Sequence, residues 1–72
     1  MTNTTLLEEY IKKSGLKKNY IAKKLKLSPY GLTKKIRNEN EFKTSEIHVL
    51  CELLNIKTLE KKESIFFAKK VD

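Results

Sequence analysis

The chain has 72 residues, which is enough for one small domain, residues 1–72. Apolar residues make up 39% of it and charged residues 35%, a balance that suits a modest core under a water-exposed surface. Leu, Ile and Phe recur at regular intervals, which argues against a disordered chain. Because the apolar patterns have a helical period throughout, we expect an all-α fold.

Positive charge is concentrated in the first half of the chain. The net charge is +7, and ten of the sixteen basic residues lie between Lys12 and Arg37, a stretch without a single Asp or Glu. The nearest carboxylates on either side belong to Glu9 and Glu39. A block of one charge sign is typical of a phosphate-binding surface. A merely solvated, lysine-rich helix face is the alternative interpretation.

Residues that carry chemistry are scarce. A lone cysteine, Cys51, cannot form an internal disulfide, and its place on an apolar helical stripe predicts a buried thiol in a reducing cytoplasm. We expect His48 at the surface, without a second metal ligand nearby. No nucleophile–base pair is present, so neither an enzyme, a metal nor a cofactor is expected. The chain has no long apolar run, and we therefore expect no signal peptide or membrane span.

Capping residues divide the N-terminal half into three helices. Thr5 followed by Glu8 fits a capping box and predicts a helix over about 5–13, ended by Gly15. A second helix is predicted over about 18–26. The third, over about 29–37, begins after Leu27-Ser28-Pro29, where serine caps the helix and proline takes its first position.

The C-terminal half predicts a fourth helix and a tail with two alternative structures. Thr44 or Ser45 caps a helix near 45–55, which carries two apolar strips. The tail, about 58–72, forms a short fifth helix or an extended segment. One strip and the last aromatic residues either close the core or form a surface for a second copy or another partner; these residues are Val49, Leu53, Phe66 and Phe67.

The third helix has an outer face that the core does not need. Leu32 and Ile36 turn inward. On the opposite side, an arc of about 100° holds no aliphatic residue. The residues in this arc are Tyr30, Thr33, Lys34 and Arg37.

Two short helices joined by a tight turn form a helix-turn-helix, which we place at about 18–37. Ala22 lies where the second helix of the motif would cross closely over the first, so a larger side chain would hold the helices apart. Lys17 and Lys18, at the start of the first helix of this motif, are predicted to bind phosphate groups.

Residues 17–36 resemble the Cro/repressor-type helix-turn-helix proteins of temperate phages. The run Ser-Pro-Tyr-Gly-Leu-Thr-Lys-Lys-Ile, followed by Glu-Phe-Lys-Thr-Ser-Glu-Ile and Ile-Phe-Phe-Ala, is most similar to the modulator-of-repression antirepressors of lactococcal phages. The resemblance covers nearly the whole chain. It implies a small helix-turn-helix bundle of four to five helices in the cytoplasm of a bacterial host cell.

The resemblance also implies a role in the lysis–lysogeny switch. The expected partner is a CI-type phage repressor, whose N-terminal DNA-binding domain the protein would bind and keep from its operator, with operator double-stranded DNA contacted through the third helix. The alternative is an autonomous Cro-type repressor that binds DNA without a protein partner. A homodimer is compatible with either function. The expected binding residues are Lys17, Lys18, Ser28, Tyr30, Thr33, Lys34, Arg37 and Asn38.

The sequence departs from the family pattern at the turn and in the third helix. Lys26 replaces the usual glycine of the turn and must tolerate a left-handed backbone, or else the turn differs. Lys35 occupies a usually apolar position, and we expect Ile36 to take over its packing. Pro29 and Gly31 stand where relatives carry base-reading side chains, and neither can make a bidentate contact to a base.

Overall fold

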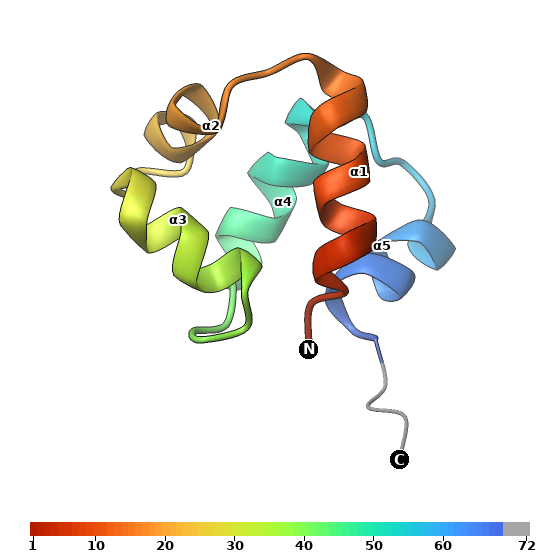
Figure 1. Ribbon diagram of the computed structural model, residues 1–72. Helices are drawn as coiled ribbons and strands as arrows, with labels where there is room; N and C mark the ends of the chain where they lie inside the picture. The colour runs from red at the N-terminus through yellow and green to blue at the C-terminus, as the bar shows by residue number, and fades with distance from the viewer. Residues whose placement is uncertain (69–72) are drawn as a thin grey trace.

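The computed structural model describes residues 1–68, and this part of the chain contains five α-helices and no strand. The helices are α1 (Thr4–Ser14), α2 (Lys18–Lys24), α3 (Pro29–Ile36), α4 (Thr44–Leu53) and α5 (Leu59–Phe66). In Figure 1, α2 and α3 lie beside each other on one side, α1 and α5 on the other, and α4 crosses between them. The predicted all-α bundle is confirmed, with the fifth segment helical.

A single apolar core joins all five helices. Its largest fully buried side chains come one from each helix: Leu7, Ile21, Leu32, Leu50 and Ile65. On α4, the second apolar strip is half-buried and packs against this core. The strip is therefore partly covered by the chain itself. At the C-terminal end Phe66 is buried and meets Phe42 edge to face, with ring centroids 5.7 Å apart, whereas Phe67 is 60% exposed.

The capping box predicted for α1 is wrong. Asn3 is the N-cap, and its Oδ1 accepts a hydrogen bond from the Leu6 N–H at 3.1 Å. Thr5 lies inside the helix, two residues after the cap position that its side chain would need. At the other end Gly15 has a φ of 73°, the left-handed conformation that the sequence predicts.

At α4 the cap also differs from the prediction. Lys43, not Thr44 or Ser45, is the N-cap residue, and its N–H donates to Oε1 of Glu46 at 2.8 Å. The first turn is therefore capped from within by a carboxylate. Thr58 caps α5 by accepting from the Lys61 N–H at 3.2 Å. Of the predicted tail, residues 69–72 lie outside the described residues.

Three helices end in the same way although none has a glycine there. Lys26, Asn38 and Asn55 follow the ends of α2, α3 and α4 with φ values of 59°, 65° and 58°. In each case the next N–H bonds to a carbonyl five residues back, as in the pair Leu27 N–H to Ala22 O at 2.8 Å. This is the Schellman arrangement, which satisfies the last carbonyls of a helix. Asparagine tolerates the left-handed region better than lysine does.

A buried ion pair joins α3 to α4. Lys35 is 9% exposed and Glu46 is 7% exposed, and Nζ of Lys35 lies 2.5 Å from Oε1 of Glu46. The prediction that Ile36 replaces Lys35 in packing is thus half right: both residues are buried, and Glu46 compensates the lysine charge. Burial alone raises the pKa of Glu46, but hydrogen bonds from Lys35 and the Lys43 backbone, with both lysine charges, bring it below 4.5.

Breaking this pair should destabilise the fold more than removing the partly exposed Lys34 from the same helix. Lys35→Met leaves an uncompensated buried carboxylate, and we expect a loss of about 3 kcal/mol in the free energy of unfolding. Lys34→Met, as control, should change it by less than about 0.5 kcal/mol. Urea unfolding followed by circular dichroism measures both. The double variant Lys35→Met/Glu46→Gln should recover part of the loss; equal stability of the single and double variants would contradict the assignment.

Glu46 should also make stability depend on acid pH. Its pKa is lowered by folding, so the carboxylate adds stability above its ordinary value of 4.5 and this contribution is lost as pH falls through the lower, folded value. We expect the urea midpoint of the wild type to drop more steeply than that of Glu46→Gln between about pH 5 and pH 2. Parallel midpoint curves for the two proteins would argue against the ion pair.

Candidate macromolecular interface on α3

The two helices predicted to form the helix-turn-helix, α2 and α3, pack closely together, and theirs is the most extensive contact between helices within residues 1–68. Ala22 is 1% exposed, and Ile21 on α2 and Leu32 on α3 are fully buried. The turn between them uses the left-handed Lys26. Of the two predicted outcomes for Lys26, the strained backbone is the one observed.

The start of α3 is built from its own capping residues. Ser28 is the N-cap, its Oγ accepts from the Gly31 N–H at 2.9 Å, and Pro29 takes the first helical position. A Cβ on Gly31 would come within 3.1 Å of that hydroxyl, so the glycine leaves room for the cap. Ser28, a predicted binding residue, thus has a structural role here.

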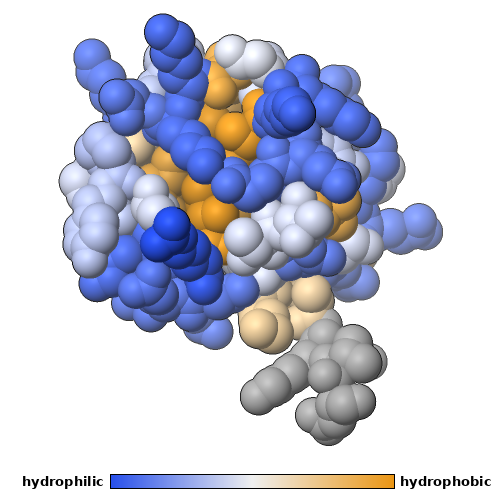
Figure 2. Space-filling view, viewed as in Figure 1, coloured by the Kyte–Doolittle hydropathy of each residue, from blue (hydrophilic) through white to orange (hydrophobic). Residues whose placement is uncertain are grey.

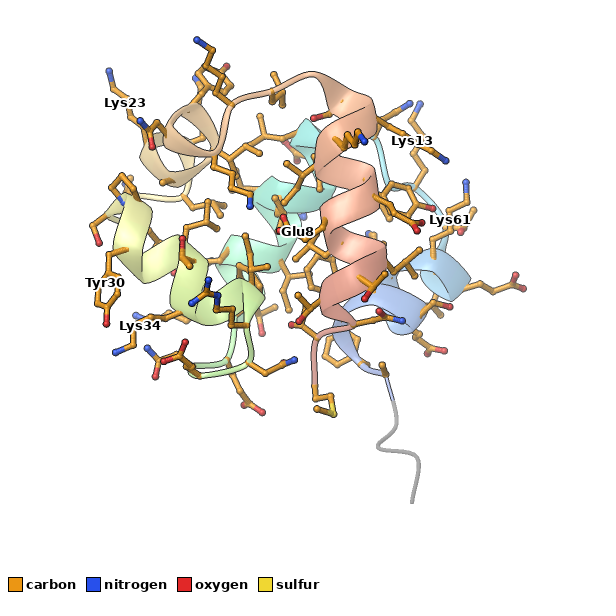
Figure 3. The ribbon with its side chains drawn as sticks, viewed as in Figure 1. Glu8, Lys13, Lys23, Tyr30, Lys34 and Lys61 are labelled. Atoms are coloured by element: carbon orange, nitrogen blue, oxygen red, sulfur yellow. The ribbon has the colours of Figure 1, made fainter. Side chains whose placement is uncertain are left out.

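The predicted outer face of α3 is directed away from the core. Tyr30 is 71% exposed, and Figure 3 shows Tyr30 and Lys34 extending outward from the helix. Nζ of Lys34 lies 5.3 Å from the centroid of the Tyr30 ring, a cation–π contact. Thr33 is half-buried and its hydroxyl donates to the Pro29 carbonyl, while Arg37, the C-cap residue, is exposed. We call these four residues the α3 face.

The two lysines at the start of α2 differ in their surroundings. Lys17 is exposed at the N-cap position. Lys18 forms an ion pair with Glu8 of α1, with Nζ and Oε2 2.9 Å apart and the two side chains 48% and 42% exposed. A phosphate approaching Lys18 would therefore meet a carboxylate already in place.

Asn38 is engaged with the N-terminal residues. Its Oδ1 accepts from the Thr2 N–H and its Nδ2 donates to the Thr2 carbonyl, both at 2.7 Å. Thr4 adds a hydrogen bond from its hydroxyl to the Ile36 carbonyl at 2.6 Å. These bonds tie the N-terminus to the end of α3, so that the Asn38 amide, predicted to bind a partner, holds the helix instead.

A small cleft lies between α1 and α3, with a volume of about 110 Å³. It joins part of the α3 face to the start of α2, and we call it the α1–α3 cleft. Its lining residues are Thr4, Glu8, Lys18, Thr33, Ile36 and Arg37. In Figure 2, hydrophilic side chains border a strip of apolar surface between α1 and the α2–α3 pair.

Sequence reasoning missed Glu8 and Thr4 in this cleft. Glu8 was assigned to a helix cap, yet it lies one turn before Lys12, at the edge of the basic block. Its approach to Lys18 depends on how the loop after Gly15 turns the chain back, and no local pattern predicts that contact. The sequence offered one indication of a role for Glu8, namely that its carboxylate lies just before the basic stretch from Lys12 to Arg37.

Cys51 and His48 are the remaining residues with reactive side chains. Cys51 is buried as predicted, and burial raises the pKa of its thiol despite the nearby charge of Lys62. His48 is at the surface and lies 2.9 Å from Glu52, one turn along α4. Within residues 1–68 no cluster of three metal-ligating side chains occurs, and no helix there has the length and apolarity needed to cross a membrane.

Comparisons with protein-family models, with curated proteins and with solved structures gave no match for this chain. The phage resemblance therefore stays a prediction from the sequence.

The left-handed backbone at Lys26 predicts that glycine is favoured there. Lys26→Gly removes a strained Cβ at the cost of a more flexible unfolded chain, and we expect a net gain of about 0.5 kcal/mol in stability. Lys24→Gly, two residues earlier inside α2, removes the same charge and should cost about 1 kcal/mol. Thermal unfolding of the two variants measures the difference. Equal destabilisation by both would show that the turn is not left-handed at residue 26.

Proposed function

We propose that this protein is a transcription regulator of a phage lysis–lysogeny switch that binds the DNA-binding domain of a CI-type repressor through its α3 face and keeps the repressor from its operator. The observation that carries the proposal is the outer side of α3. Tyr30 is 71% exposed and stacked with Lys34, on a helix whose inner side is fully occupied by the core.

The chemistry of this face suits a protein partner. Tyrosine and arginine are favoured anchors of protein interfaces because they bury large, rigid surfaces and also form hydrogen bonds. Tyr30 and Arg37 supply one of each. The first turn of α3, in contrast, offers little for reading bases, because Pro29 has no donor and the Ser28 hydroxyl is used as a cap.

Operator DNA is the second candidate target, and the charge distribution favours it. The acid-free stretch from Lys12 to Arg37 surrounds α2 and α3, and most of its lysines are exposed. Such a surface attracts the phosphate backbone whatever the base sequence. We therefore propose that α3 also contacts operator DNA. If the protein has no repressor partner, this DNA contact alone would make it an autonomous Cro-type repressor.

The test uses two tyrosines in matched positions. Tyr20 on α2 is 45% exposed and stacks with Lys24 four residues later, just as Tyr30 on α3 stacks with Lys34. We expect Tyr30→Ala to weaken binding to the repressor's DNA-binding domain by at least about tenfold, as removal of a central interface anchor does. Tyr20→Ala should leave it within about threefold. Calorimetric titration gives both constants, and circular dichroism checks the fold.

Gel filtration of the wild-type protein with the repressor domain should show one co-eluting complex that no longer retards operator DNA. Separate elution at micromolar concentration, with the repressor still on its operator, would refute repressor binding. In that case, salt-dependent retardation of operator DNA by this protein alone would leave the Cro-type alternative.

A further inference from the structure

Glu8 is the sole carboxylate among the residues that line the α1–α3 cleft. The cleft brings it together with two cations from different helices, Lys18 at the start of α2 and Arg37 at the end of α3. Figure 3 places Glu8 on the side of α1 that is turned toward α3, whereas Lys13 of the same helix points the other way. One negative charge thus lies at the border of an otherwise cationic surface.

The Glu8 carboxylate already forms the contact that a phosphate would form. Its Oε2 lies 2.9 Å from Nζ of Lys18, the distance of a charge-assisted hydrogen bond. A carboxylate and a phosphate oxygen compete for the same ammonium group, so only one of them can use it fully. Both side chains of the pair are about half exposed, which allows a ligand to reach the pair from solvent.

The cleft itself has the composition of a site for one phosphate group. Besides the two cations it is lined by Thr33, whose hydroxyl already donates to the Pro29 carbonyl, and its volume is about 110 Å³. Thr33 and Arg37 also belong to the α3 face, so that a strand backbone lying along α3 would pass the cleft. Glu8 faces the same position and repels any phosphate that enters it.

We propose that Glu8 is a specificity-determining residue: it occupies the Lys18 end of a phosphate site in the α1–α3 cleft and so weakens binding to the nucleic-acid backbone by one phosphate contact. This inference rests on the proposed function only in taking the α3 face as the contact surface. The weaker attraction for the DNA backbone would explain why a basic helix-turn-helix surface favours a protein partner over DNA.

Glu9 provides a matched control for the experiment. It is the next residue of α1, it is exposed, and no ion pair involves it within residues 1–68. Glu8→Gln and Glu9→Gln raise the net charge by the same one unit, so a general increase in attraction for DNA is common to both. Only Glu8→Gln frees Lys18 for a phosphate.

The measurement is binding of a short fluorescein-labelled duplex of random sequence, followed by anisotropy at about 50 and 200 mM salt. One additional phosphate contact adds about 0.9 to the slope of log K against log salt, so the affinity of Glu8→Gln should fall about 3.5-fold more over this range than that of Glu9→Gln. At the lower salt concentration, Glu8→Gln should be the tighter binder of the two.

A second pair of variants assigns the effect to the cleft. In a Lys18→Gln background, where the ammonium is absent, the replacement of Glu8 by Gln should raise DNA affinity no more than the replacement of Glu9. Identical salt slopes for Glu8→Gln and Glu9→Gln, an effect that persists without Lys18, or no DNA binding by any variant would overturn the inference. Binding to the repressor domain is measured separately, so these outcomes leave the proposed function to its own test.

Discussion

Leu32 and Ile36 are buried on the inner side of α3, and Lys35 of the same helix forms an ion pair with Glu46 at the start of α4. These contacts allow α3 only one orientation about its own axis. Two apolar contacts alone would tolerate some rolling of a short helix. The Lys35–Glu46 ion pair prevents such rotation, because turning the helix would separate the two charges and leave both buried without a partner. The direction of the outer face follows from this constraint.

Hydrogen bonds at both ends of α3 also hold the helix in this orientation. Its first turn is closed by the Ser28 hydroxyl, and its last carbonyls are satisfied by the left-handed turn at Asn38 and by the Thr4 hydroxyl. The Asn38 amide in turn holds Thr2. With eight residues, α3 is too short to be stable in isolation, and these contacts replace the cooperativity that a longer helix has of itself. A helix fixed in this way holds Tyr30 and Lys34 in a defined orientation, as the proposed contact surface requires.

The helices themselves were predictable because their signals are local. The period of the apolar residues, Ser28-Pro29 at the start of α3 and Gly15 after α1 each act within one turn, and the structure agrees with them. The errors at Asn3 and Lys43 are of the same local kind: several polar residues compete for each cap, and the winner depends on where the first turn is held by the rest of the chain.

The placement of the predicted site residues could be foreseen only where it depends on a single helix. The arc of Tyr30, Thr33, Lys34 and Arg37 follows from helical geometry, whereas the pairs Glu8–Lys18, Lys35–Glu46 and Thr2–Asn38 join residues ten to thirty-six positions apart. These pairs change the interpretation most. They engage the Asn38 amide with Thr2 and the Lys18 ammonium with Glu8, and no local pattern of the sequence predicts either contact.

The most direct test of the α3 face as the contact surface is an NMR titration of the isotope-labelled protein with the repressor's DNA-binding domain or with operator DNA. We expect the perturbed amides to cluster in residues 28–37 and at the start of α2, while those of α5 stay unchanged. Perturbations confined to α5 and the exposed Phe67, with α3 unaffected, would contradict it.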